Sequence, residues 1–406
     1  MKKIFAMALC LTAVGSMSAQ KINVDNAKKL SGKFDKIEEA RNLIKQAMED
    51  PTTSQDANTY FIAGKIEFDN YDKGLTNGMI KPDDPSADPM AMAQELLNGY
   101  KYFMMALPYD SVPNEKGEIK PKFAKNIVNI LAGHATDYFT AGSSMYNAGK
   151  YYPEAYEGFN IYAELPEAAF MGSKAPKILP ADRAQAYFNA GISAYSGNQV
   201  KKAAEAFKKA RLLGSDDSKA YMYEIACWQN LAQNDTTMQE PAQAAIMEIA
   251  EAGYNKFGLA EPIFLNNLVN TYVQEENYAA ALDKVNALIA ENPENSNLYG
   301  LEGFIQDRKG DDEASLAAYQ KAVAIADCDF ETLKNAAKKF YTMGTHKLNE
   351  LEPNDTTGKL AVKTGYFDTA NDICQRAKAL NADDPDLANV LDSIEYALQT
   401  YFWIPR

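Results

Sequence analysis

The sequence is poor in the residues from which most catalytic and metal centres are built. Its 406 residues include only two histidines, two tryptophans and four cysteines. It contains no H-E-x-x-H, C-x-x-C or G-x-S-x-G sequence, patterns that place zinc ligands, redox thiols and serine nucleophiles. His134 and His346 have no second histidine or cysteine beside them, which favours a packed or surface role for each. We therefore expect no catalytic residue, no metal and no cofactor, and we predict that the protein is not an enzyme.

Positive charge is also scarce. The chain carries 41 lysines and arginines against 55 aspartates and glutamates, a net charge of −14. Non-specific binding to nucleic acid needs cationic side chains that replace the counterions of the phosphates. The acidic balance therefore predicts that nucleic acid is not a partner.

Long apolar runs are missing except at the start of the chain. Residues 4–14 are apolar, Lys2 and Lys3 precede them, and small residues follow. This is the layout of a secretory signal peptide, and the run is too short to cross a bilayer as a helix. We predict a signal peptide over residues 1–19, export to the periplasm or beyond the cell, and no transmembrane segment.

The cysteines do not suggest a disulfide framework. Removal of the signal peptide leaves Cys227, Cys328 and Cys374, an odd number that permits at most one internal disulfide. Cys374 and Cys227 lie on the apolar stripes of predicted helices. We expect both to be buried as small hydrophobic side chains.

What the sequence does contain is a repeated helical pattern in residues 262–329. Apolar side chains recur at the i, i+3, i+4, i+7 spacing of one helix face, and a second stripe follows after a break. The arrangement returns 34 residues later. The first copy comprises Leu265, Leu268, Val269, Tyr272, Ala281, Val285 and Leu288, and the second comprises Tyr299, Gly303, Gly310, Ser315, Tyr319 and Ala322. A 34-residue period built from two amphipathic helices resembles the tetratricopeptide repeat.

The resemblance implies an all-α fold, a right-handed superhelical solenoid of antiparallel helix pairs. Small residues such as Gly303 would let paired helices approach closely. We expect N-terminal helices with long loops over 20–171, the repeat array over 172–384, and a C-terminal capping helix over 385–406. Long loops are predicted at 72–89 and 108–120, and insertions near 234–241 and 346–359, where Gly, Pro, Asn and Asp are frequent.

The resemblance also implies where a partner binds, because the first helix of each pair lines the concave face in this family. The candidates are the side chains on first helices that point away from the predicted core. They are Phe188, Ile192, Tyr195, Met222, Gln229, Asn266, Asn270, Phe304, Arg308, Lys334, Lys338 and Tyr341. Packing against neighbouring helices explains Phe188 and Ile192 equally well.

Two functions follow from these features. The first is an exported, non-enzymatic scaffold that binds a protein or peptide partner on its concave face. The alternative is a glycan-binding protein of an envelope or nutrient-uptake system, since some helical-repeat proteins present aromatic platforms to sugars. Flat, exposed rings at Phe188, Tyr195 and Phe304 would favour the alternative.

Three hydroxyl groups are candidates for O-glycosylation. The sequence Asn-Asp-Thr-Thr occurs at 234–237 and again at 354–357, and Asp110 precedes Ser111. These sites resemble an acceptor motif in which Asp is followed by Ser or Thr and then by an aliphatic residue or Thr. The candidates are Ser111, Thr236 and Thr356. Turn and capping chemistry is the competing explanation, because Asn, Asp and Thr favour both.

Overall fold

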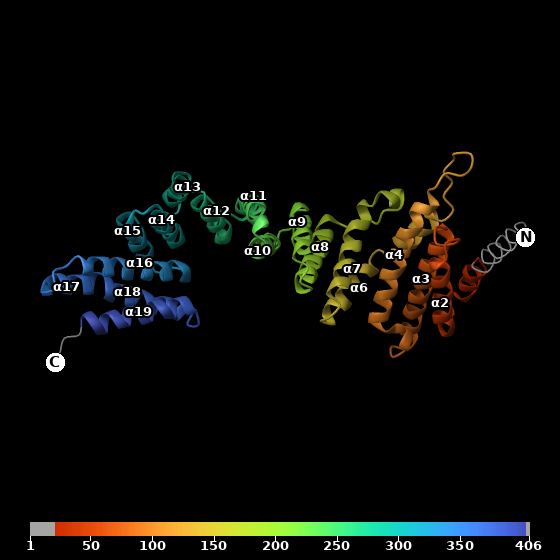
Figure 1. The fold of residues 1–406 in the computed structure, drawn as a ribbon, viewed down its shortest axis with the longest axis horizontal. Coiled ribbons are helices and arrows are strands. Elements are labelled where there is room, and N and C mark those ends of the chain that lie inside the picture. The colour runs from red at the N-terminus through yellow and green to blue at the C-terminus, as the bar shows by residue number, and fades with distance from the viewer. Residues whose placement is uncertain (1–20, 403–406) are drawn as a thin grey trace, which may run out of the picture. The chain divides into compact units, whose positions relative to one another are not determined.

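The computed structural model describes residues 21–402, and within this range the chain is helical and has no strand (Figure 1). The predicted fold class, an all-α arrangement of antiparallel helix pairs, is confirmed. The chain divides into two compact units, and the boundary in the sequence lies between Ala242 and Gln243. The predicted signal peptide lies outside the described residues, and the predicted segment boundaries at 171 and 384 stay predictions.

The N-terminal unit, red to green in Figure 1, is built of helices that pack in chain order. Close neighbours are α3 with α4, α6 with α7, and α8 with α9, and α7 also packs on α8. The elements are η1 (Phe34–Lys36), α2 (Ile37–Glu49), α3 (Ala57–Ile80), η2 (Pro85–Ala87), α4 (Pro89–Asp110), α5 (Ala124–Gly133), α6 (Asp137–Asn147), α7 (Tyr152–Glu164), η3 (Leu165–Glu167), η4 (Ala169–Lys174), α8 (Pro180–Ser196), α9 (Val200–Leu212), α10 (Ser218–Asn234) and η5 (Thr236–Met238).

The C-terminal unit continues the pattern from within α11. Its packed neighbours include α12 with α13, α14 with α15, α16 with α18, and α18 with α19. The helix predicted from residue 385 begins there, with Asp384 accepting a hydrogen bond from the Leu387 N–H at its first turn. The elements are α11 (Gln239–Phe257), η6 (Gly258–Ala260), α12 (Pro262–Gln274), α13 (Tyr278–Glu291), α14 (Ser296–Lys309), α15 (Asp312–Ala324), α16 (Phe330–Asn349), α17 (Thr356–Val362), the π-helical η7 (Lys363–Asp368), α18 (Thr369–Leu380) and α19 (Pro385–Tyr401).

Paired helices approach closely where a glycine on the first helix faces an aromatic ring on the second. A Cβ atom added to Gly191 would lie 2.6 Å from the ring of Phe207, and one added to Gly303 would lie 2.9 Å from the ring of Tyr319. Contacts this short require the ring or a helix to move. The glycine therefore sets the helix spacing. Two further pairs share the arrangement: Gly64 with Phe103 and Gly142 with Phe159.

The long loop predicted over 72–89 is wrong. Helix α3 continues to Ile80, so that only residues 81–88 connect it to α4, and these include the turn η2. The glycines that suggested a loop lie on α3, at the place where η2 crosses this helix. A Cβ atom on Gly74 would collide with the backbone oxygen of Ser86, and one on Gly78 would lie 2.8 Å from Ala87. Here glycine permits close packing and does not end the helix.

The two predicted insertions are also largely helical. Helix α10 ends at Asn234 and α11 begins at Gln239, with η5 between them. Helix α16 extends to Asn349, and α17 begins at Thr356. Asp235 and Asp355 each accept a hydrogen bond from a backbone N–H at the start of the following helix. The Asn-Asp residues therefore start new helices, which shortens the connections that their composition suggested.

The predicted loop that follows α4 is present and is held at both ends by one side chain. It begins after Asp110, three residues later than predicted, because Pro108 is still part of the helix. The Asp110 carboxylate accepts hydrogen bonds of 2.8 Å from the N–H groups of Lys122, Phe123 and Ala124. These are unsatisfied donors at the start of α5, so Asp110 caps that helix from the other end of the loop.

Cys227 and Cys374 are buried, as predicted. Both are unpaired, and Cys328 is likewise buried and unpaired. Burial raises the pKa of the Cys227 thiol to about 12 and that of Cys374 to about 11. These thiols therefore stay protonated and act as packing groups.

Candidate functional site

The twelve predicted binding residues are divided between the two units. Phe188, Ile192, Tyr195, Met222 and Gln229 lie on α8 and α10, and the other seven lie on α12, α14 and α16.

In the N-terminal unit, Tyr195 and Gln229 are exposed, whereas Phe188, Ile192 and Met222 are half-buried. The Phe188 ring lies 5.6 Å from that of Phe207 and 6.0 Å from that of Tyr223. Phe188 is therefore largely occupied by packing between helices, and Tyr195 is the one ring of the predicted aromatic set in this unit that is open to solvent.

In the C-terminal unit, several predicted side chains have partners within the protein. The Lys334 ammonium lies 3.1 Å from Glu331 and 3.3 Å from Asp384. The Arg308 guanidinium lies 5.4 Å from the centre of the Phe304 ring. Asn270 and Lys338 are exposed, Asn266 is half-buried, and Tyr341 is half-buried with its ring edge-on to Phe367.

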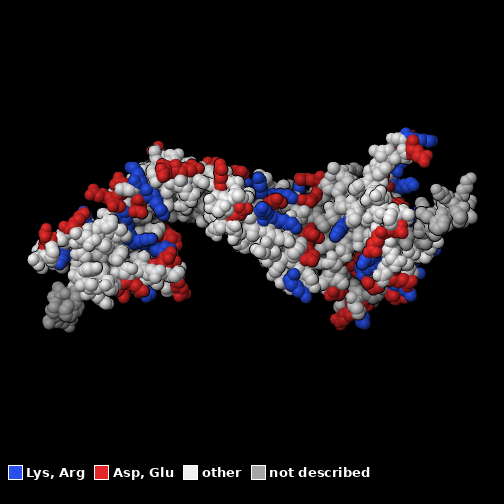
Figure 2. All heavy atoms as spheres, in the orientation of Figure 1, with Lys and Arg blue, Asp and Glu red and all other residues white. Residues whose placement is uncertain are grey.

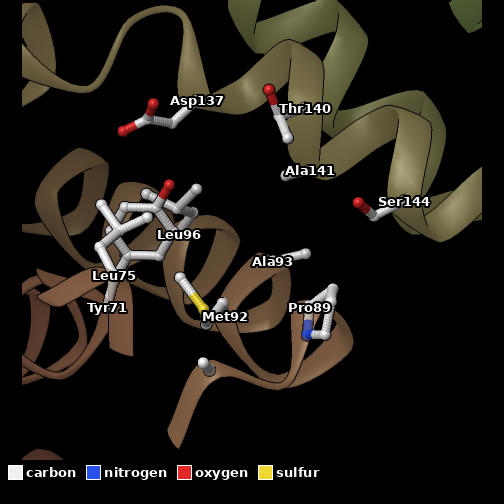
Figure 3. A pocket seen from close by; sticks show the side chains of 11 residues that line it. Tyr71, Leu75, Pro89, Met92, Ala93, Leu96, Asp137, Thr140, Ala141 and Ser144 are labelled. Carbon is white, nitrogen blue, oxygen red and sulfur yellow. The ribbon is translucent and has the colours of Figure 1, made fainter. Parts of the chain in front are cut away.

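The sequence reasoning missed a cavity of about 240 Å³ between α3, α4 and α6 (Figure 3). Leu75, Met92 and Leu96 give it an apolar floor. Polar groups line the opposite wall, where Asp137, Thr140 and Ser144 project from successive turns of α6. Lining residues come from three separate helices, and no local motif announces such a site.

A hydrogen-bonded cluster fixes the acidic end of this cavity. Asp137 Oδ2 lies 2.9 Å from His134 Nδ1, and Asp72 Oδ1 lies 3.5 Å from His134 Nε2. The imidazole is also packed against the Phe68 ring, 5.1 Å away. Burial, followed by the nearby Asp137 carboxylate, raises the pKa of the Tyr71 hydroxyl.

His134 lies behind the cavity wall and contacts Asp137 and not the cavity itself. Both ring nitrogens of His134 face carboxylates, and the ring does not line the cavity. A general base needs a nitrogen within hydrogen-bond reach of the ligand. The histidine therefore positions Asp137, which agrees with the packed role expected for it.

A second, smaller cavity of about 190 Å³ lies on the other side of α6, against α8. It is lined by Ser143, Tyr146, Asn147, Phe159, Asn189 and Ile192, the last of which is a predicted binding residue. Side chains three residues apart on α6 thus serve different cavities: Thr140 and Ser144 face the first, and Ser143 and Asn147 face the second. We call the surface that carries both cavities the first-helix face, because α3, α6 and α8 are each the first helix of a pair.

Charges of both signs are interspersed over the visible side of each unit (Figure 2). In the described part of the chain, no helix is both long enough and apolar enough to cross a membrane.

The three hydroxyls predicted as glycosylation sites are exposed. Ser111 Oγ donates a hydrogen bond to the Leu107 carbonyl. The aspartates that precede Ser111, Thr236 and Thr356 all cap helix starts. Capping chemistry accounts for the recurrence of the motif, and glycosylation stays a prediction that an intact mass of the native protein would test.

Comparison with known proteins supports the repeat assignment for one stretch. The family described as "Tetratricopeptide repeat" matches residues 266–328, which span most of α12 to α15. This stretch lies inside the region whose 34-residue period carried the resemblance. The helix pairs and this match together support tetratricopeptide repeats in this stretch, a type of repeat that typically serves in scaffolds for protein interactions.

Solved structures with similar repeats share little sequence with the chain. YrrB, a TPR protein with an unusual peptide-binding site, is 14% identical and aligns over 53% of this chain and 97% of its own, with a TM-score of 0.34. A TPR repeats protein from Bacteroides fragilis is 17% identical over 64% of this chain and 97% of its own, with a TM-score of 0.29. The TPR domain of P58(IPK) is 12% identical over 94% and 99%, with a TM-score of 0.27. TM-scores this low carry no argument about the site. No curated protein matches the chain significantly.

Proposed function

We propose that the protein is an exported, non-enzymatic scaffold that binds a peptide segment of a protein partner on the first-helix face of its N-terminal unit. The observation that carries this proposal is the cavity between α3, α4 and α6. It combines an apolar floor with a wall of polar groups that includes Asp137. A side chain of the partner would enter it, and the polar wall would fix the orientation of the peptide.

The dimensions of the cavity suit one side chain. Pockets for drug-sized ligands span roughly 300–1,000 Å³, whereas this cavity measures about 240 Å³. Burying a Leu, Met or Phe side chain against Leu75, Met92 and Leu96 would contribute about 1.5–3 kcal/mol. Because a single side chain gives only weak binding, the partner needs further contacts along the face.

The smaller cavity supplies groups for such contacts. The amides of Asn147 and Asn189 have donors and acceptors that match the N–H and C=O groups of an extended peptide, although the Asn189 oxygen already accepts one hydrogen bond from Gln185 Nε2. Ser143 adds a hydroxyl. A peptide that crosses α6 would therefore meet an apolar cavity first and a hydrogen-bonding cavity next.

The aromatic side chains give less support to the glycan-binding alternative. Phe188 is half-buried between rings, and the half-buried Phe304 lies beside the Arg308 guanidinium. Tyr195 is 47% exposed. A sugar platform needs flat rings that are open to solvent, and only this last ring meets the condition. We therefore favour a protein partner.

The export part of the proposal rests on residues 1–19, which lie outside the described residues. Its test is the N-terminal sequence and cell fraction of the native protein. Removal of roughly the first 19 residues and recovery from the envelope or the medium would support export. A protein that keeps its initial segment and stays in the cytoplasm would refute it.

The binding part is tested by crosslinking the protein in its native envelope and identifying what is captured. The variant Leu75→Asp places a charge on the cavity floor. Met79→Asp is the matched control, because Met79 lies one turn further along α3, is 84% exposed and does not line the cavity. We expect the same partner with the wild type and with Met79→Asp, and loss of it with Leu75→Asp. Equal capture by all three proteins would show that the partner binds elsewhere.

A further inference from the structure

A separate polar groove of about 440 Å³ lies over α2, α3 and α4 of the same unit. It does not share a lining residue with the two cavities of the first-helix face. Its walls contain a cluster of charged side chains that are unusually well buried for such groups.

Two carboxylates of this cluster are removed from solvent. Glu67 is 4% exposed and Glu95 is 5% exposed. They share one guanidinium: Arg41 donates to both oxygens of Glu67, at 2.9 and 2.6 Å, and to Glu95 Oε1 at 3.2 Å. Arg41 also donates to the exposed Glu38 at 2.8 Å. The single positive charge of Arg41 is thus shared among three carboxylates.

The unequal pairing leaves one oxygen of Glu95 without a partner. Glu95 Oε1 accepts hydrogen bonds from both Arg41 and Asn70. Glu95 Oε2 is buried and accepts none. A buried acceptor that lacks a donor costs free energy, and the cost is larger for a charged group. Burial also raises the pKa of Glu95, the expected response of an undercompensated carboxylate.

The remaining walls of the groove offer apolar contacts. Ile44 and Met48 contribute from α2, and Ala91 contributes from α4. The Tyr102 ring and the amides of Gln94 and Asn98 complete the lining. An apolar wall beside a buried negative charge fits a ligand that has an aliphatic stem and a cationic head.

We propose that this groove binds an ammonium or guanidinium group carried on an aliphatic chain, with Glu95 Oε2 accepting its N–H. Glu95 lines the groove, and its Oε1 is held by Arg41 and Asn70, so Oε2 is the oxygen left to accept a further donor. The same chemistry is offered by a lysine or arginine side chain of a protein partner and by a free alkyl amine. This site is independent of the peptide-binding face proposed above.

The main competitor for this role is the protein's own Lys45, which also lines the groove and is exposed. If Lys45 neutralised Glu95, replacing it would destabilise the fold and would not improve binding of an added cation. Under our proposal, Lys45→Met leaves the melting temperature unchanged and strengthens binding of a cation, because a repelling charge has been removed.

The test is titration of the full-length mature protein with N-acetyl-lysine methylamide and, separately, with pentylamine, followed by calorimetry or by NMR. The uncharged N-acetyl-norleucine methylamide is the ligand control. Glu95→Gln keeps the shape of the side chain and removes its charge. Glu49→Gln is the protein control, since Glu49 is exposed on α2 and does not line the groove.

We expect both cations to bind the wild type and Glu49→Gln equally, and binding to Glu95→Gln to be about tenfold weaker, or about 1.4 kcal/mol. Tighter binding of the capped lysine would indicate a partner's side chain, and tighter binding of pentylamine would indicate a free amine. Absence of binding to the wild type would overturn the proposal, as would equal binding to Glu95→Gln or equal binding of the norleucine control. Leu75→Asp should bind the cations normally, so failure of the peptide site and failure of this site are distinguishable.

Discussion

The two units differ in how far they depart from a regular repeat. In the C-terminal unit, the four helices α12 to α15 have 13, 14, 14 and 13 residues, and this is where the family match lies. In the N-terminal unit, α3 has 24 residues and α4 has 22. These longer helices line both the α3–α4–α6 cavity and the polar groove. The regular stretch reveals the type of fold, whereas the irregular stretch carries the features that would make this protein's binding specific.

The largest loss of stability should come from a charge placed in the core of the regular stretch. Ala281 in α13 is fully buried, and Ala281→Asp should cost roughly 3–5 kcal/mol, the range for an uncompensated buried charge. The core clusters of the two units contain different residues. We therefore expect hydrogen exchange to accelerate within residues 243–402 while residues 21–242 keep their protection.

The control for this variant is Ala279→Asp, two residues away on the same helix. Ala279 is exposed in the first turn of α13, where a negative charge is favourable. Its melting temperature should be unchanged or slightly higher. Equal destabilisation by both variants would contradict the assigned helix face, and loss of protection in both units would show that they unfold together.

A smaller effect is expected when a single methyl group is added between paired helices. Gly191→Ala and Gly303→Ala test the same contact in the two units, because each new Cβ atom would meet an aromatic ring at less than 3.0 Å. Each should cost about 1–3 kcal/mol in denaturant unfolding. Gly133→Ala is the control, since a Cβ atom there meets nothing within 4 Å. If all three variants were equally stable, the glycines would not set the helix spacing.

Removal of the long-range cap should have a more local effect, confined to the irregular unit. Asp110→Ala leaves three backbone N–H groups at the start of α5 without their acceptor and should cost about 1–2 kcal/mol. Limited proteolysis should show faster cleavage within residues 111–121. Ser111→Ala loses only one hydrogen bond to the Leu107 carbonyl and should be cleaved at the wild-type rate. Unchanged cleavage of Asp110→Ala would contradict the capping role.

The smallest effect is a pH dependence that originates in the polar groove. Burial raises the pKa of Glu95, so the folded state binds this proton more tightly than the unfolded state does. Protonated Glu95 therefore stabilises the fold at a pH below the pKa that this group has in the unfolded chain. The stabilisation is lost as the pH rises through the pKa that it has in the folded protein. Glu95→Gln should lack this loss, and its stability relative to the wild type should increase as the pH rises from 4 to 7. Denaturant unfolding at several pH values measures the difference, and parallel curves would contradict it.

The sequence predicted the contacts that repeat and missed those that do not. The close approach of paired helices at Gly303 follows from a fixed spacing along two helices, and the structure contains it, with Gly303 against the Tyr319 ring. The loop expected at 72–89 was wrong because Gly74 and Gly78 were interpreted as helix breakers. Glycine occupies both positions because the turn η2 packs against them. Local composition does not reveal such a tertiary contact.

The candidate site shows the same limitation. Ile192, assigned to the partner-binding face from its position on the helix, lines the smaller cavity, and its binding role stays a prediction. The larger cavity instead joins Tyr71, Met92 and Asp137 from three helices, and its acidic end depends on a contact between Asp72 and His134. Such contacts depend on how helices pair across long connections. One local signal was available: His134 and Asp137 are three residues apart and can meet across a helix junction.

The cap formed by Asp110 also makes the loop after α4 a useful place to modify the protein. Residues 111–121 are exposed throughout, and both ends of the loop are tied to the same carboxylate. The entropy of closing a flexible loop grows only slowly with its length, by about 0.6 kcal/mol for each doubling. A fluorescent reporter or an affinity tag inserted near Gly117 should therefore leave α4 and α5 in place, and would allow the partner to be found without labelling either end of the chain.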